Sequence, residues 1–400
     1  MRLTYYILIL GFIGQLSAQQ TFEPGKVIDS IPVSKTTNET FALYLPTSYE
    51  ASKASPILFI YEPGGRGRLG IQTFIEASEA YGHILVCSNN SKNGPYERNF
   101  AIASNLFDHV FSRFNIDGRQ LYLAGFSGGS RLAWTIASMA ENIAGVIACG
   151  AGMSESKSPI LVRQEFAYAA ICGDRDMNYK EMLDVVDYLG RTGQDLTLIT
   201  FQGGHSWPPA SEIMQAFDWL ALQAHQKGTI TIPENKLYQS LERNYAIAKN
   251  LETKGNLLGA VENYERVLSS YNDFYKLDSV MTNLEDLKKG SLYKRALKAR
   301  KAAVAKEKEL TGTLLDRFIN EFNHLKKIDL PWWEKKLNQL KEKYSGSGDE
   351  YELMLDRVLN YLYAMAYSRT NPNLYQASEA QKNFCNALCK LVYPKHVVKQ

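Results

Sequence analysis

The stretch Leu121-Tyr122-Leu123-Ala124-Gly125-Phe126-Ser127-Gly128-Gly129 decides the fold of the first half of this 400-residue chain. An apolar run that ends in Gly-x-Ser-x-Gly and continues into a helical pattern from Ser130 indicates a serine on a sharp turn between a strand and a helix. The neighbours of the serine must lack side chains to avoid clashing with it. Ser127 is therefore a candidate nucleophile, and the Gly128 N–H at the helix start is a candidate donor to an anion.

The residues around this stretch repeat the same alternation of elements. Between about residues 38 and 225, short apolar runs alternate with helical patterns, and nearly continuous apolar runs are typical of strands buried on both faces of a parallel sheet. We predict strands at 41–45, 57–61, 83–87, 120–125, 144–149, 167–172 and 196–201, with helices at 102–114, 130–141, 179–189 and 211–223. The pattern predicts a three-layer α/β domain with a mostly parallel sheet.

A histidine and an acid follow the serine in the chain order that this kind of turn predicts. Two histidines come after Ser127 in this region, His205 and His225. His205 lies on a glycine-flanked loop just beyond the last predicted strand, whereas His225 lies at the far end of a helix. We therefore predict His205 as the base; the alternative for a single loop histidine is a solvated surface residue.

Two aspartates compete for the role of the acid. Both lie in Gly173-Asp174-Arg175-Asp176, which follows the predicted strand 167–172. Asp176 is far enough into the loop to turn toward His205, and Asp174 is suited to capping the turn or pairing with Arg175. We favour Asp176 as the group that accepts the histidine Nδ1–H and fixes its tautomer.

Together, Gly-Phe-Ser-Gly-Gly, the Gly-x-x-Asp turn and Gly203-Gly204-His205-Ser206-Trp207-Pro208 resemble the secreted esterases related to polyhydroxybutyrate depolymerases and feruloyl esterases. The resemblance covers roughly residues 38–225. It implies an α/β-hydrolase fold, hydrolysis of a carboxylic ester, and triad positions at Ser127, Asp176 and His205.

The chain departs from that family after the predicted strand 57–61. The family has His-Gly there, whereas this chain has Glu62-Pro63-Gly64-Gly65-Arg66-Gly67. Proline has no N–H, so Gly64 or Gly65 must complete the oxyanion hole with Gly128, and we favour Gly65. Glu62 either pairs with Arg66 or Arg68 or faces the substrate. Trp207, Glu62 and Asn90, the last in the polar loop 88–94, are the predicted substrate contacts.

The N-terminus predicts export. Arg2, an apolar run at 5–13, and Leu16-Ser17-Ala18 before Gln19 have the layout of a secretory signal peptide over residues 1–18. The alternative, an uncleaved anchor helix, needs a longer apolar run. We expect a secreted or periplasmic protein with no membrane span after cleavage.

Composition excludes several classes of function. A formal net charge of +3, with 22% charged residues, argues against a nucleic-acid binder. We find no cluster of ligating residues at metal spacing and expect no metal or cofactor. Of the five cysteines, Cys87, Cys149 and Cys172 read as core residues, and Cys385 and Cys389 share one helix face at a spacing that would strain a disulfide.

Composition changes after residue 227. We predict an α/β-hydrolase domain at 19–227, a linker at 228–235 and an all-α helical domain at 236–400 that contributes no catalytic residue. Ala248, Ala260, Tyr264 and Val267 resemble one tetratricopeptide repeat, echoed by Ala380, Phe384 and Ala387, although an irregular bundle fits equally well. Such a domain could dock a protein partner.

The sequence as a whole favours an exported serine hydrolase that cleaves a small or polymer-linked carboxylic ester through an acyl-enzyme. Two alternatives stay open: a serine peptidase of the same fold, and a non-catalytic binding protein that docks a partner through its helical domain.

Overall fold

The computed structural model describes residues 22–153, 165–372 and 374–394. The predicted signal peptide lies outside these residues. The first half of the chain forms an eight-stranded sheet in the order β1-β2-β4-β3-β5-β6-β7-β8. Its strands are β1 (Val27–Pro32), β2 (Thr40–Tyr44), β3 (Ser55–Tyr61), β4 (Ile84–Ser88), β5 (Ile116–Phe126), β6 (Ile143–Cys149), β7 (Ala167–Gly173) and β8 (Leu196–Phe201).

The sheet is parallel except at one edge. Strand β2 runs antiparallel to both of its neighbours, β1 and β4, and all other pairs are parallel. This strand order, with the serine turn directly after β5, is that of the α/β-hydrolase fold. The predicted fold class is confirmed, although the sequence analysis missed the edge strand β1.

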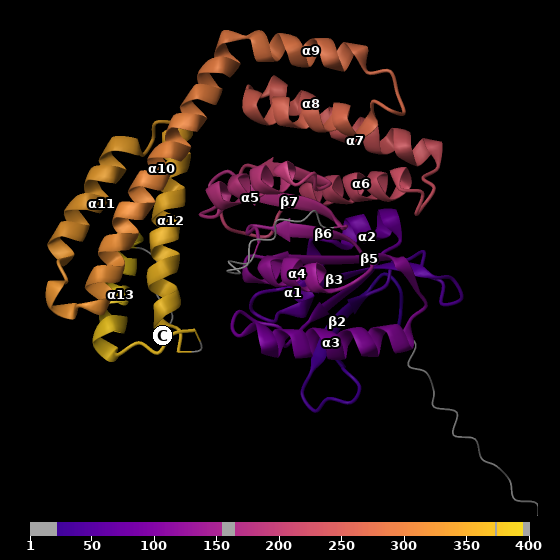
Figure 1. Cartoon of the computed structure of the whole chain (residues 1–400), viewed down its shortest axis with the longest axis horizontal. Helices are drawn as coiled ribbons and strands as arrows, with labels where there is room; N and C mark the ends of the chain where they lie inside the picture. The colour runs from indigo at the N-terminus through magenta and orange to yellow at the C-terminus, as the bar shows by residue number, and fades with distance from the viewer. Residues whose placement is uncertain (1–21, 154–164, 373, 395–400) are drawn as a thin grey trace, which may run out of the picture.

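Helices cover both faces of the sheet, as the two-sided burial of its strands requires (Figure 1). All seven residues of β7 are buried. One face packs against α3 (Tyr96–Arg113), α4 (Gly128–Met139) and α5 (Tyr179–Arg191). The other face packs against α1 (Gly67–Gln72), α2 (Ile75–Tyr81) and α6 (Ala210–Gln226).

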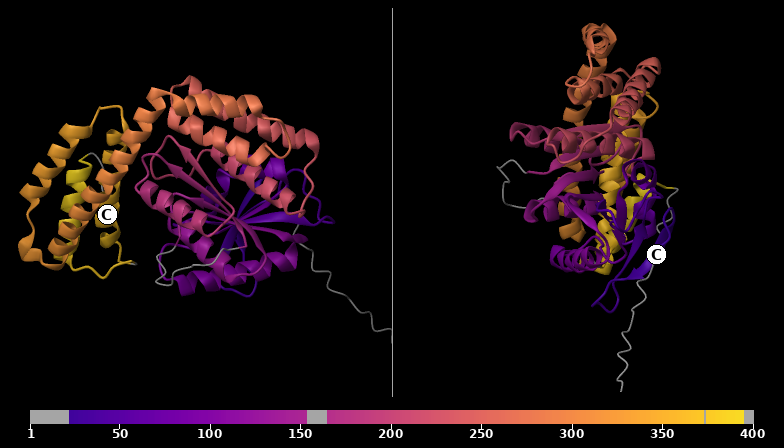
Figure 2. Two further views of the ribbon diagram at one scale, coloured as in Figure 1. Left: turned by 45° about the horizontal axis from the view of Figure 1, so that its top comes forward. Right: turned by 90° about the vertical axis from the view of Figure 1, so that its right-hand side faces the viewer.

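The second half of the chain is helical, as predicted, but it packs as two groups (Figure 2). The first group comprises α7 (Glu234–Thr253), α8 (Leu257–Tyr271) and α9 (Asp278–Lys289), and its core includes Leu222 of α6. The second group has its own core and comprises α10 (Ser291–Asn323), the 3-10 helix η1 (Leu325–Lys327), α11 (Leu330–Tyr344), α12 (Glu350–Thr370) and α13 (Glu379–Val392). Whether 236–400 folds independently stays a prediction.

The residues that suggested a tetratricopeptide repeat fall into both groups. Ala248, Ala260, Tyr264 and Val267 are buried where α7 packs against α8. Phe384, from the predicted echo, lies in the core of the second group on α13. The match to a repeat stays a prediction.

The five cysteines are buried and free, so Cys385 and Cys389 are not bridged. Burial raises the pKa of Cys385 to about 11 and that of Cys389 to about 12. Among the described residues, no helix is long and apolar enough to cross a membrane, and no group of three His, Cys, Asp or Glu side chains is placed to hold a metal ion.

Candidate active site

Ser127 lies on a strained turn between β5 and α4. Its backbone has φ 53° and ψ −120°, a conformation that a residue with a side chain rarely adopts. Its N–H donates to the carbonyl oxygen of Cys149 on β6 at 2.8 Å. A side chain on Gly125 would strike the Gly129 backbone, and one on Gly129 would strike the carbonyl of Tyr61. These two glycines therefore make room for backbone rather than for the serine side chain.

The structure brings Ser127, His205 and Asp176 into one hydrogen-bonded chain. The Oγ of Ser127 is 3.0 Å from Nε2 of His205, and Nδ1 of His205 is 2.9 Å from both carboxylate oxygens of Asp176. Asp176 is fully buried. Because a carboxylate only accepts hydrogen bonds, Nδ1 carries the proton, and the lone pair of Nε2 faces the serine hydroxyl.

The loop after β7 gives its two aspartates different partners. Asp176 also accepts the Asn178 N–H at 2.8 Å, which fixes its carboxylate toward His205. Asp174 accepts the Gly203 N–H at 3.1 Å, and burial raises its pKa. Asp176 thus contacts the histidine, while Asp174 ties the loop after β7 to the loop that carries His205.

Arg175 leaves this loop in another direction. It does not pair with Asp174, as one alternative had it, but forms an ion pair with Asp356 of α12. The carbonyl oxygen of Asp174 accepts a hydrogen bond from Arg357 at 2.6 Å. The second helical group therefore holds the loop that bears Asp176.

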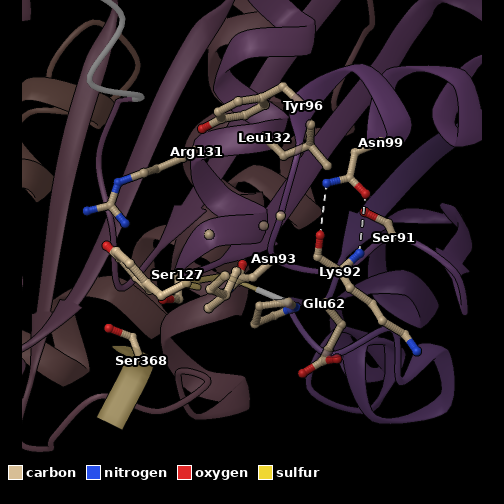
Figure 3. Close-up of a pocket in the computed structure, with 16 residues that line it drawn as sticks. Glu62, Ser91, Lys92, Asn93, Tyr96, Asn99, Ser127, Arg131, Leu132 and Ser368 are labelled. Carbon is tan, nitrogen blue, oxygen red and sulfur yellow. Dashed lines mark hydrogen bonds between the residues drawn. The ribbon is translucent and has the colours of Figure 1, made fainter. Parts of the chain in front are cut away.

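Ser127 opens into a cleft of about 490 Å³ (Figure 3). Its walls come from the turn after β3, the loop after β4, α3, α4 and the second helical group. Besides Ser127, Gly128 and Gly129, the described residues that line it are Glu62, Pro63, Ser91, Lys92, Asn93, Gly94, Tyr96, Asn99, Arg131, Leu132, Ser368, Leu374 and Tyr375. Apart from Gly128 and Gly129, sequence reasoning named none of the cleft residues on α3, on α4 or in the second helical group, and no local pattern at 368–375 signals a contact with the distant turn that carries Ser127.

The turn after β3 is organised by Glu62. Its buried carboxylate accepts the N–H groups of Gly64 at 2.8 Å and Arg66 at 2.9 Å and pairs with the Arg66 guanidinium, as one alternative predicted. The Gly65 N–H donates to the Glu62 carbonyl oxygen at 3.0 Å. Gly65 as the second oxyanion donor is therefore contradicted, because its N–H closes the turn. Glu62 borders the cleft, but its oxygens are engaged within its own loop.

Asn90 does not line the cleft. Its Oδ1 accepts the Thr40 N–H at 2.8 Å and its Nδ2 donates to the Asn38 carbonyl oxygen at 3.0 Å. These bonds tie the loop after β4 to the start of β2. Asn90 borders a separate cavity of about 390 Å³, so the prediction of a contact at the Ser127 cleft is wrong, although other residues of the same loop are there.

Trp207 lies beneath the site. Its ring packs against Phe126 with centroids 5.3 Å apart and edge-on against Phe74 at 5.7 Å. Phe126 in turn contacts the imidazole of His205 at 4.6 Å. Trp207 therefore supports the histidine through Phe126; it is not among the residues that line the cleft, and its predicted role as a substrate contact stays a prediction.

Comparison with known proteins adds likeness to solved structures. No model of a known protein family matches the chain, and no curated protein matches it. A ferulic acid esterase is similar at 18% identity and a TM-score of 0.40 over 50% of this chain and 98% of its own. A fluorophosphonate-binding serine hydrolase of Staphylococcus aureus is similar at 15% identity and a TM-score of 0.41, over 50% of this chain and 99% of its own. An esterase of Thermogutta terrifontis is similar at 11% identity and a TM-score of 0.40, over 52% of this chain and 96% of its own.

Proposed function

We propose that this protein is an exported serine hydrolase that cleaves carboxylic esters through an acyl-enzyme. One observation carries the proposal: the hydroxyl of Ser127, on a strained turn, is aligned with His205 and the buried Asp176 at hydrogen-bonding distances. Strain at a non-glycine residue persists only where the surrounding structure enforces it, and such residues gather at active sites.

In the first half-reaction, Ser127 Oγ attacks the ester carbonyl carbon while His205 Nε2 takes the hydroxyl proton. The imidazolium is stabilised by Asp176, and the negative charge on the former carbonyl oxygen falls beside the Gly128 N–H at the start of α4. The tetrahedral species then breaks its bond to the alcohol oxygen, which receives the proton from Nε2. The alcohol leaves, and Ser127 carries the acyl group.

In the second half-reaction, water occupies the place that the alcohol vacated. His205 removes a proton from this water, whose oxygen attacks the acyl carbon. Collapse of the second tetrahedral species returns the proton to Ser127 Oγ and releases the carboxylic acid. Ser127, Asp176 and His205 suffice for both steps, and all three precede residue 228.

The cleft supports an ester with hydrogen-bonding groups next to the scissile bond. Its lining includes Lys92, Asn93, Tyr96, Ser368 and Tyr375, a polar set with few aliphatic side chains. A long hydrocarbon chain would leave these groups without partners, at a cost of about 1–3 kcal/mol for each group that becomes buried.

Labelling with a fluorophosphonate tests the proposal directly. We expect covalent labelling of wild-type protein and none of the Ser127→Ala variant. Hydrolysis of aryl, acetyl, feruloyl and longer-chain esters then tests the ester class, with polar acyl groups preferred. Absence of labelling, together with no hydrolysis of any ester, would contradict the enzyme and favour a binding protein.

Export is a separate part of the proposal and rests on the residues 1–18 alone. It predicts a mature protein that begins near Gln19 and is found outside the cytoplasm. N-terminal sequencing of the protein from fractionated cells checks this, and an intact Met1 on cytoplasmic protein would contradict it.

A further inference from the structure

The turn after β3 leaves the oxyanion site one donor short. Pro63 has no N–H, the Gly64 N–H is bound by the Glu62 carboxylate, and the Gly65 N–H closes the turn. The Gly128 N–H, in the first turn of α4, has no partner within its helix and is free to serve. If Ser127 acts as proposed above, any further donor must come from another residue that lines the cleft.

We propose that the side-chain amide of Asn93 is this second oxyanion donor, an inference that rests on the proposed hydrolase function. Its carboxamide stands against Gly128: the atom nearest to a Cβ placed on that glycine would be Oδ1 of Asn93, followed by Cγ at 2.8 Å and Nδ2 at 3.3 Å, so Nδ2–H reaches the oxyanion after the carboxamide turns. Asn93 therefore lies beside the residue that provides the first donor. Figure 3 shows Asn93 next to Ser127 in the cleft.

The backbone around Asn93 is held from two sides. The Asn93 N–H donates to the carbonyl oxygen of Pro63 at 2.8 Å, which ties it to the turn after β3. The buried Asn99 of α3 accepts the Lys92 N–H at 3.3 Å and donates to the Lys92 carbonyl oxygen at 2.9 Å (Figure 3). These bonds fix the backbone that carries the Asn93 side chain, so only the soft terminal torsion of the carboxamide has to change when charge develops.

The chemistry of asparagine fits the role. The carboxamide has two N–H donors and one acceptor, and its terminal torsion is soft, so a half turn exchanges Oδ1 and Nδ2. A developing oxyanion repels Oδ1 and attracts Nδ2–H. The same contact explains why the residue after Ser127 is glycine: any side chain there would displace the Asn93 carboxamide.

Replacing Asn93 tests the inference. For Asn93→Ala we expect kcat on an aryl ester to fall about 100- to 1,000-fold with KM little changed, as loss of one oxyanion donor does elsewhere. Affinity for a trifluoromethyl ketone, whose adduct with Ser127 carries the same oxyanion, should fall in parallel. Asn93→Asp keeps the shape, loses the N–H and should lose at least as much, which keeps the test available if the alanine variant does not fold.

A matched control and two outcomes separate the possible failures. Asn115→Ala alters an exposed asparagine at the opposite end of β5 and should leave kcat unchanged. If Asn93→Ala and Asn93→Asp keep kcat within about threefold of wild type while Ser127→Ala is inactive, the Asn93 role is overturned and the hydrolase stands. If Ser127→Ala stays active, the proposed function itself fails.

Discussion

The two helical groups of this protein meet the α/β domain in different ways. From α8, Arg266 donates to the carbonyl oxygen of Leu198 within β8 at 2.8 Å and to Gln215 of α6 at 2.7 Å. From α12, Arg357 donates to the carbonyl oxygen of Asp174, in the loop just after β7, at 2.6 Å. Among the described residues that line the cleft, none comes from α7–α9, whereas three follow residue 367.

The difference shows that docking position, rather than the kind of contact, decides whether an added helix reaches the site. Both groups use a buried arginine to bind a backbone carbonyl of the sheet domain. Only α12 does so at the carboxyl edge of the parallel strands, where ligands of open α/β sheets bind. The α7–α9 group therefore packs against the α/β domain away from the cleft, and the α10–α13 group lines part of the cleft.

The largest effect should come from Ser127→Ala, which tests whether the α/β domain provides the nucleophile. We expect kcat to fall at least about 10⁴-fold, because without the nucleophile only binding and oxyanion stabilisation remain. Steady-state kinetics on an aryl ester measures this, with thermal unfolding to show an intact fold. Retention of more than about a tenth of the activity would refute the nucleophile assignment.

Next in size is Asp176→Asn, which should lower kcat about 10⁴-fold with little change in KM, since an amide misplaces the imidazole tautomer. Asp174→Asn is the matched control in the same loop, and we expect a much smaller effect because Asp174 accepts the Gly203 N–H and does not contact His205. A reversal of the two effects would transfer the acid role to Asp174.

Arg357→Met and Arg266→Met compare the two helical groups directly. Arg357→Met should cost about 3–5 kcal/mol of unfolding free energy, because it leaves the buried Glu307 without its partner at 2.7 Å. Arg266→Met should lower the free energy of unfolding by less, about 1–3 kcal/mol, because it leaves the Leu198 carbonyl oxygen and the Gln215 side chain without their donor. Urea unfolding measures both.

The activity of the two folded variants tests whether the α10–α13 group, and not the α7–α9 group, influences the cleft. Arg357→Met should lower kcat/KM about 10- to 100-fold, because the loop that bears Asp176 loses a contact that positions it. Arg266→Met should leave kcat/KM unchanged. Equal losses in the two variants would erase the distinction between the helical groups.

The smallest effect should come from Tyr375→Ala, which removes part of the wall that α10–α13 contributes. Tyr375 is held beneath Arg369, whose guanidinium lies 4.9 Å from its ring. We expect KM for a bulky ester to rise about tenfold, equivalent to 1.4 kcal/mol, with kcat unchanged. Tyr238→Ala, an exposed tyrosine of α7, should alter neither constant. A KM that does not move for Tyr375→Ala would remove this residue from the substrate site.

The sequence predicts the sheet and the serine turn well because both leave local signals. Apolar runs mark buried strands, and glycines mark the sharp turn between β5 and α4. The chain order of serine, acid and histidine then selects Ser127, Asp176 and His205. The structure places these residues together, and their catalytic roles stay predictions until variants are measured.

The rest of the site depends on contacts that no local pattern encodes. The engagement of Gly65 follows from how Glu62 folds back on its own turn, and Trp207 lies under Phe126 because of packing across α2 and α6. The polar loop 88–94 was recognised, but only the fold shows that Asn93 faces the cleft while Asn90 faces β2. The wall at 368–375 depends on where a distant helix docks.

The buried cysteines bear on the chemical stability of the folded chain. Its five thiols are unpaired, and burial raises the pKa of each one, so at neutral pH all are protonated and poor nucleophiles. The native state therefore requires no disulfide oxidant or isomerase. In the folded state, burial shields these thiols from glutathione and from oxidants alike.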